Sequence, residues 1–184
     1  MFIKHRPGTQ DDHVYRDVIE NNEYRLPQVL KPEDVVVDIG AHIGIFAAAC
    51  LARGAGTVLA FEADQDNFKL LQEHLLAKDG QHAEAFNLAV WKPGHDTMYF
   101  TGYPDFYNAC GSILPWAVVE HTNKRIPVTT CSLDEILEVV EKQGKRVRLL
   151  KIDAEFAEYP IIYSSKKLGI VDQIVMEVHE IPEY

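Results

Sequence analysis

The stretch VVVDIGAHIG, residues 35–44, decides the fold that the sequence predicts. It begins with a run of β-branched residues and no polar alternation, which is typical of a strand covered on both faces. The strand ends at an acid, Asp38, and glycines follow at Gly40 and Gly44. Gly40 would let the backbone approach a ligand, and Gly44 would let the next helix start close to the sheet. The pattern D-x-G-x-x-x-G differs from the G-x-G-x-x-G of dinucleotide-binding loops.

Strands and helices alternate along the rest of the chain. We expect further strands over 57–63, 83–91, 147–155 and 171–179, with an antiparallel one over 97–102. We expect helices over 44–54, 64–80, 132–144 and 157–169. Asp64 is the expected N-cap of the second helix, Ser132 and Glu135 form a capping box, and Pro160 should interrupt the last helix early.

This alternation predicts an α/β fold with a doubly wound, mainly parallel sheet. We expect one domain over 1–184, with a lead-in over 1–34. The irregular stretch 103–124, which is rich in aromatic residues, is either a lid over an apolar acceptor or a surface loop. The stretch 125–131 reads as a connection into the helix that follows it.

Composition narrows the class of protein. The 184 residues include 28 acids and 18 bases, for a net charge of -10, and an acidic surface repels nucleic-acid phosphates. The three cysteines are scattered, without a C-x-x-C pair, and no signal sequence or membrane-length apolar stretch is seen. We therefore expect a cytoplasmic protein that binds neither nucleic acid nor membrane.

Acids end the first two predicted strands. An acid before the first glycine would repel a pyrophosphate but suits a cation, and S-adenosylmethionine combines an ammonium, a sulfonium and a ribose. Glu62 at the end of the second strand could accept the ribose hydroxyls, as an acid does in nucleotide-binding folds. Two alternatives stay open: Asp38 ties down its own loop, and Glu62 is merely exposed.

A second polar group follows the last two predicted strands. Asp153 and Glu155 are two residues apart, and so are Glu177 and His179, so each pair shares a face if its strand continues that far. Together they could deprotonate a hydroxyl or bind a hard divalent cation such as magnesium. The alternative is an ion-paired rim in which Lys151 neutralises one acid.

The chain also resembles the FkbM family of S-adenosylmethionine-dependent methyltransferases. The matching segments are NNEYRLPQVLKPEDVVVDIGAHIGIFA, AFEADQDNFKLLQEHL, AFNLAVW, VTTCSLDEIL, LLKIDAEFAEYPII and IVMEVH, in the family's order. The resemblance implies a class I, Rossmann-like methyltransferase fold. It implies a cofactor site of Asp38, Gly40, Ala41, Gly44, Glu62, Leu88 and Ala89, with Asp153 and Glu155 facing the methyl-transfer site.

The chain departs from the family at two places. Phe156 stands where the family has glycine, in Asp-Val-Glu-Gly-Ala-Glu. The family's final strand pair is also lacking, which would leave the last strand as an apolar edge that a second copy could cover, forming a homodimer.

We therefore expect an enzyme that moves the methyl of S-adenosylmethionine to a hydroxyl of a secondary metabolite or sugar. Asp153 or His179 would be the general base and Glu155 would orient the base or the substrate, while His42 is expected to be structural. We assign no metal ligand, although a magnesium ion at the acidic rim stays open. The alternatives are a non-catalytic or truncated cofactor-binding module and an NAD-dependent oxidoreductase, which the missing G-x-G-x-x-G disfavours.

Overall fold

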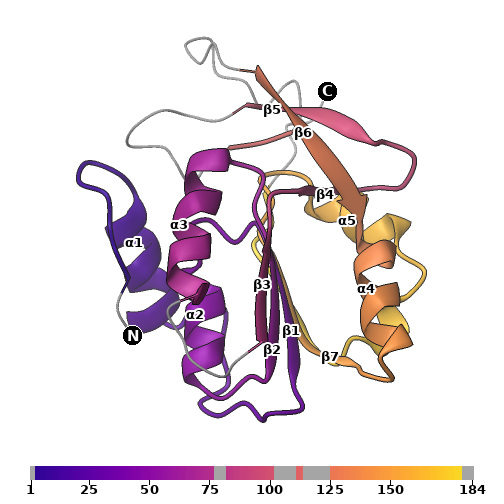
Figure 1. The fold of residues 1–184 in the computed structure, drawn as a ribbon, viewed down its shortest axis with the longest axis horizontal. Coiled ribbons are helices and arrows are strands. Elements are labelled where there is room, and N and C mark those ends of the chain that lie inside the picture. The colour runs from indigo at the N-terminus through magenta and orange to yellow at the C-terminus, as the bar shows by residue number, and fades with distance from the viewer. Residues whose placement is uncertain (1–2, 77–81, 102–110, 114–124, 180–184) are drawn as a thin grey trace.

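The computed structural model describes residues 3–76, 82–101, 111–113 and 125–179. A five-stranded parallel sheet in the order β3-β2-β1-β7-β8 forms its centre (Figure 1). The strands are β1 (Val35–Ile39), β2 (Thr57–Phe61), β3 (His82–Phe86), β7 (Val147–Ile152) and β8 (Ile174–Met176). The predicted parallel α/β fold is thus confirmed. The strand order reverses between β1 and β7, which is where doubly wound sheets bind ligands.

Helices cover both faces of this sheet (Figure 1). The helices α2 (Ile45–Ala52) and α3 (Gln65–Leu76) lie on one face, and α4 (Leu133–Lys142) and α5 (Glu158–Ser164) lie on the other. Every residue of β1 is buried, and its side chains alternate between the two cores: Val36 packs with α2, whereas Val37 packs with α4. This double burial explains why the strand is apolar without alternation.

Two helices begin as the sequence predicts. Asp64 Oδ1 accepts hydrogen bonds from the backbone N–H groups of Asp66 and Asn67, both at 2.9 Å. Ser132 and Glu135 form the capping box at the start of α4. Pro160 lies in the first turn of α5, where its missing N–H breaks no helical hydrogen bond, so the expected interruption is wrong.

The expected single strand over 83–91 is also wrong. It divides into β3 and β4 (Ala89–Trp91), which belong to different sheets. Between them the Asn87 side chain donates to the backbone oxygens of Glu62 (2.9 Å) and Ala63 (3.1 Å), which holds the chain at the end of β2.

A small second sheet has the order β4-β6-β5. The expected strand over 97–102 is present as β5 (Thr97–Thr101) and pairs antiparallel with β6 (Arg125–Ser132). Strand β6 was not predicted from the sequence, where residues 125–131 were expected to form a connection. Apart from residues 111–113, the expected lid over 103–124 lies outside the described residues.

The segments at the two ends are less regular. Before β1, the short helix α1 (Asp11–Tyr15) and a π-helical turn (Arg16–Glu20) lie on the outer side of α2 and α3 (Figure 1). Near the other end, a 3₁₀ turn (Leu168–Ile170) precedes β8, which is shorter than expected. Within the described residues β8 pairs with β7 alone, and Ile174 is 40% exposed. Homodimer formation through this edge stays a prediction.

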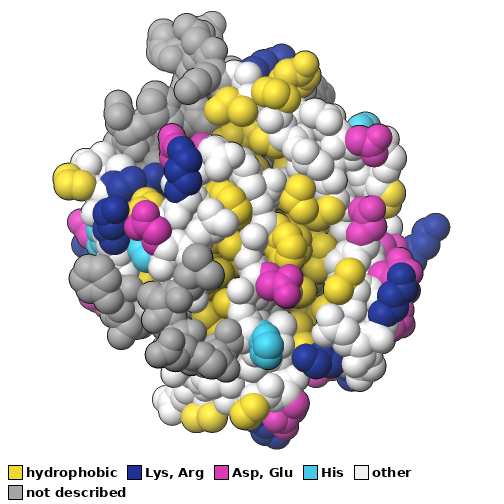
Figure 2. Space-filling view, in the orientation of Figure 1, with side chains coloured by type: hydrophobic (Ala, Val, Ile, Leu, Met, Phe, Trp, Pro, Cys, Tyr) yellow, Lys and Arg dark blue, Asp and Glu magenta, His cyan; other side chains and the backbone are white. Residues whose placement is uncertain are grey.

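The face that carries α4 has an apolar groove between this helix and strands β2 and β3 (Figure 2). Its apolar lining includes Leu59, Phe61, Phe86, Ile136 and Val139. Among the described helices, none combines the length and apolar character needed to cross a membrane.

Candidate functional site

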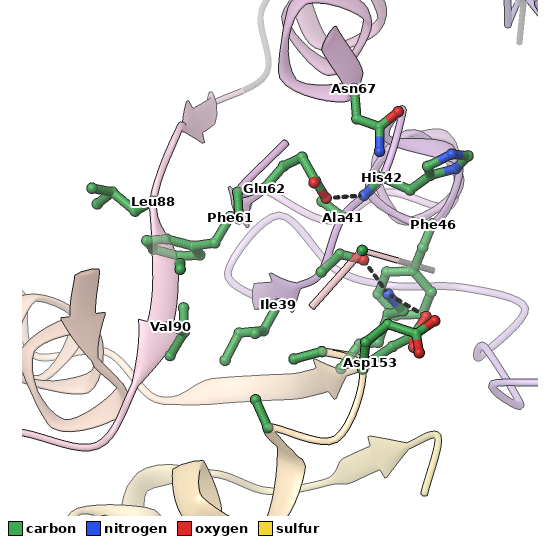
Figure 3. A pocket seen from close by; sticks show the side chains of 18 of the residues that line it. Ile39, Ala41, His42, Phe46, Phe61, Glu62, Asn67, Leu88, Val90 and Asp153 are labelled. Atoms are coloured by element: carbon green, nitrogen blue, oxygen red, sulfur yellow. Dashed lines mark hydrogen bonds and ion pairs between the residues drawn. The ribbon is translucent and has the colours of Figure 1, made fainter. Parts of the chain in front are cut away.

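A pocket opens at the carboxyl ends of β1, β2 and β7 (Figure 3). Seven of the predicted site residues line it: Gly40, Ala41, Glu62, Leu88, Ala89, Asp153 and Glu155. The predicted residues Asp38, Gly44 and His179 lie nearby but do not line it. The pocket therefore brings together residues from the predicted cofactor loops after β1 and β2 and acids from the predicted polar group after β7.

The loop after β1 requires glycine at Gly40. Its φ is +72°, and a Cβ atom there would lie 1.7 Å from the backbone oxygen of Asp153. The backbone N–H groups of Gly40 and Ala41 both donate to the oxygen of Phe61, at 3.0 and 2.9 Å. Gly44 serves packing, because a Cβ atom there would meet the Leu71 side chain at 2.6 Å.

Glu62 lies on the pocket wall with its carboxylate held by two loops (Figure 3). Its oxygens accept hydrogen bonds from the backbone N–H of His42 at 2.7 Å and of Asp64 at 2.8 Å. Burial raises the pKa of Glu62 to about 7, although these two hydrogen bonds oppose the shift. A carboxylate oxygen has a second lone pair, so each can accept one more hydrogen bond from a ligand.

His42 contributes its backbone to this arrangement. Burial lowers the pKa of its imidazole to about 4, so the ring is neutral at pH 7. The ring Nε2 lies 3.4 Å from both Arg6 and Asp11 of the lead-in. These contacts agree with the structural role that the sequence reading gave to His42.

Asp38 is fully buried opposite Lys151, its partner in the neighbouring strand β7. The Lys151 Nζ atom lies 3.3 Å from Asp38 Oδ1 and donates to the oxygen of Gly40 at 2.7 Å. Burial alone would lower the pKa of Lys151, but the carboxylates of Asp38 and Asp153 outweigh it and raise the pKa. The cation that Asp38 faces is thus a side chain of the protein. This geometry favours the alternative in which Asp38 ties down its own loop, and contact with the cofactor stays a prediction.

The turn after β7 holds two residues in the left-handed backbone region. Glu155 has a φ of +46° and Phe156 a φ of +74°, values that favour glycine. The fully buried Glu158 holds the turn, because its Oε1 accepts hydrogen bonds from the N–H groups of Ala154 (3.0 Å) and Phe156 (3.2 Å). Phe156 therefore has a backbone conformation that favours glycine, the residue that the family usually has at this position.

His179 lies among three carboxylates. Its Nδ1 is 3.0 Å from Glu158, and its Nε2 is 3.3 Å from Glu155 and 3.7 Å from Glu177. The hydrogen bond with Glu158 raises the pKa of His179 to about 9. The ring is therefore an imidazolium at pH 7, and in this form it has no nitrogen that can accept a proton. This argues against the predicted role of His179 as general base.

Glu155, in contrast to His179, can accept a proton near neutral pH. Burial raises its pKa to about 7, even though the neighbouring His179 lowers it. Glu155 lines the pocket, and its backbone oxygen accepts a hydrogen bond from the Ser112 hydroxyl at 2.6 Å. A carboxyl group that titrates near neutral pH can exchange a proton with a substrate.

Asp153, Glu177 and His179 each place one potential metal-ligand atom within 4.8 Å of the others. However, Asp153 already faces Lys151, and His179 is itself a cation. Magnesium prefers an octahedral set of oxygens. The side chains at this rim therefore do not fit a magnesium site.

Two residues on the pocket wall were not assigned to the site from the sequence. Tyr24, in the lead-in, donates its hydroxyl to Asp153 at 2.9 Å, and its one signal in the sequence is its place in the segment NNEYRLPQVLKPED, which resembles the FkbM family. Lys151 was expected only to neutralise one acid of the rim, although it contacts Gly40 in the loop after β1 and Asp153 after β7. Glu158 lies beside the pocket and holds the turn that carries Glu155. Its closeness in the sequence to Asp153 and Glu155 is the one feature that could have pointed to it.

Comparison with known proteins identifies the family of this chain. A family model described as the methyltransferase FkbM domain matches residues 38–184. The AMB antimetabolite synthetase AmbE of Pseudomonas aeruginosa is 27% identical over 209 residues, which cover 93% of this chain. The chain spans only 10% of the length of that synthetase.

Two solved structures align with this chain. Methyltransferase FkbM from Methylobacillus flagellatus aligns with a TM-score of 0.45 and 14% identity, over 73% of this chain and 29% of that one. A putative RNA methyltransferase from Pyrococcus horikoshii aligns with a TM-score of 0.44 and 15% identity, over 96% of this chain and 67% of that one.

Proposed function

The chain belongs to the FkbM family of S-adenosylmethionine-dependent methyltransferases, and from this premise we propose that its pocket binds S-adenosylmethionine for methyl transfer to a hydroxyl of a small molecule. The observation that carries the proposal is Glu62, an oriented carboxylate on the pocket wall at the end of β2. An acid at this place in nucleotide-binding folds accepts the ribose hydroxyls.

The remaining wall suits the other parts of the cofactor. Leu88 and Ala89 border the pocket beyond Glu62 and offer an apolar surface to the adenine ring. Asp153 and Glu155 border its other side, toward β7. In this orientation the methyl group points to the carboxylates, and the acceptor enters from their side.

The proposed reaction is a direct displacement. The acceptor oxygen forms a bond to the methyl carbon while the bond between that carbon and the sulfur breaks. The electron pair of the broken bond stays on the sulfur. The hydroxyl proton passes to a carboxylate, for which Glu155 is the better candidate because its pKa is raised to about 7. Asp153 then orients the substrate, and alignment of the oxygen with the sulfur supplies much of the rate.

Charge also limits the acceptor class that we propose. Asp153, Glu155 and Glu177 lie on this rim, against the cations Lys151 and His179. Carboxylates repel phosphorylated or carboxylated acceptors, so a neutral sugar or secondary-metabolite hydroxyl is favoured over them.

A second candidate is a cofactor-binding module without turnover. Phe156 favours it, because a bulky side chain stands in the turn that carries Glu155, where the family has glycine. This candidate predicts that S-adenosylhomocysteine binds but no hydroxyl acceptor is methylated.

Calorimetry with S-adenosylhomocysteine tests the proposed cofactor site. The wild type should bind with micromolar affinity, and Glu62→Ala should weaken binding at least about tenfold, since hydrogen bonds to a charged group contribute about 1.5–3 kcal/mol. Glu73→Ala, an exposed carboxylate on α3, is the matched control and should bind like the wild type. Unchanged affinity in a folded Glu62→Ala variant would contradict the proposal.

A further inference from the structure

Two donors hold one oxygen of Asp153. The Tyr24 hydroxyl donates to Oδ2 at 2.9 Å, and Lys151 Nζ lies 3.4 Å from the same oxygen. The Tyr24 ring is itself fixed, because it packs edge-on against Phe46 at 5.5 Å and lies 5.2 Å from the Lys151 ammonium. Both donors are buried, with Tyr24 only 8% and Lys151 only 3% exposed.

This arrangement differs from an ordinary surface ion pair. A carboxylate that a single flexible lysine contacts can rotate, whereas two buried donors on the same oxygen fix the plane of the group. The other oxygen, Oδ1, is then the one available to a ligand, and Asp153 lines the pocket. The geometry therefore presents one carboxylate oxygen in a fixed direction.

The Lys151 ammonium also connects the two halves of the pocket. It donates to the backbone oxygen of Gly40 in the loop after β1, and it faces Asp153 after β7. Tyr24 lies before residue 38, where the family match begins, so the residues of that match do not complete this arrangement by themselves.

We infer that Tyr24 and Lys151 are positioning residues that hold Asp153 so that its Oδ1 atom faces the positively charged centre of the bound cofactor. The inference rests on the proposed function, since it needs the cofactor to lie in this pocket. It assigns to the lead-in a part in the site that the proposed function does not include.

Two cofactor analogues separate this role from simple binding. Sinefungin carries an ammonium group where S-adenosylmethionine carries its transferable methyl, whereas S-adenosylhomocysteine carries no charge there. The ratio of their affinities therefore reports whether a carboxylate oxygen faces that position. A purely structural role for Tyr24 would change both affinities together and leave the ratio unchanged.

The experiment is calorimetry of both analogues on the wild type, Tyr24→Phe and Asp153→Asn. Tyr24→Phe keeps the ring and removes the hydroxyl. It should leave S-adenosylhomocysteine affinity within about twofold of the wild type and lower the preference for sinefungin about tenfold, the effect expected for one hydrogen bond to a charged group. Tyr163→Phe, at a residue that is 80% exposed, is the control and should change neither affinity.

Asp153→Asn should abolish the preference for sinefungin, and this result does not depend on the folding of the Tyr24 variant. Adding Tyr24→Phe to Asp153→Asn should then lower the preference no further, since the hydroxyl acts through the carboxylate. A preference that survives in Asp153→Asn, or that is unchanged in a folded Tyr24→Phe variant, overturns the inference. Wild-type protein that does not bind S-adenosylhomocysteine overturns the proposed function, and the inference falls with it.

Discussion

The two halves of the pocket are built by different means. The half after β1 and β2 is made of backbone: Gly40 and Ala41 donate N–H groups to Phe61, and Glu62 is fixed by N–H groups of its own and the neighbouring loop. The half after β7 is made of side chains, with His179 among three carboxylates. The first half depends on local chain geometry, and the second depends on charges brought together from distant segments.

The comparison suggests that the two halves respond differently to substitution. Loss of a backbone-held group should affect ligand binding and leave the fold stable. Loss of a charge from the side-chain network should affect stability as well, because it leaves a buried partner uncompensated. Lys151 is the place where this contrast is strongest, because it contacts both halves.

The largest effect is expected for Lys151→Met. It removes the cation between Asp38 and Asp153 and leaves a fully buried carboxylate, which should lower the free energy of unfolding by about 3–5 kcal/mol. Denaturant unfolding measures the change. Asp38→Asn in the same chain should recover most of the loss, since it removes the uncompensated charge. If Lys151→Met alone is as stable as the wild type, this ion pair does not hold the two halves of the pocket together.

A smaller effect, dependent on pH, is expected for His179→Gln. The pKa of His179 is raised from 6.5 to about 9, so its contribution to stability is fully present below pH 6.5 and is lost as the pH rises through 9. The substitution should cost about 1–2 kcal/mol near pH 6 and little near pH 10. Melting temperatures across this range measure it. A loss of stability that is the same at pH 6 and at pH 10 would mean that the charge of His179 does not stabilise the fold.

The smallest effect concerns the left-handed turn. At a φ of +74°, Phe156→Gly should be more stable than Phe156→Ala by about 1 kcal/mol, because only glycine adopts this backbone without strain.

The same pair of substitutions at Val139, an exposed position in the helix α4, provides the control for this turn. There alanine should be the more stable residue by about 1 kcal/mol. Chemical denaturation of all four variants makes the comparison. If alanine is also preferred at position 156, the turn is not strained as the structure indicates.

The same contrast explains how much the sequence could predict. The parallel sheet, Gly40, Glu62 and both helix caps follow from local patterns, because strand burial and capping leave a mark within a few residues. The break between β3 and β4 was missed, since it depends on Asn87 reaching the end of β2.

The second half of the pocket was only partly predictable. The sequence placed Asp153 and Glu155 together, but the protonation of His179 depends on Glu158, 21 residues away in the chain. Tyr24 donates to Asp153 across 129 residues. Such contacts leave no periodic signal in a single sequence, so the assignment of an acid, a base or a positioning residue needs the fold.

The most direct test of the account is a crystal structure of the protein with S-adenosylhomocysteine bound. The account predicts that both ribose hydroxyls lie within hydrogen-bonding distance of the Glu62 carboxylate, with the adenine beside Leu88 and Ala89 and the sulfur on the side of Asp153. A nucleoside bound instead in the groove between α4 and strands β2 and β3, or bound with Glu62 out of reach, would contradict it.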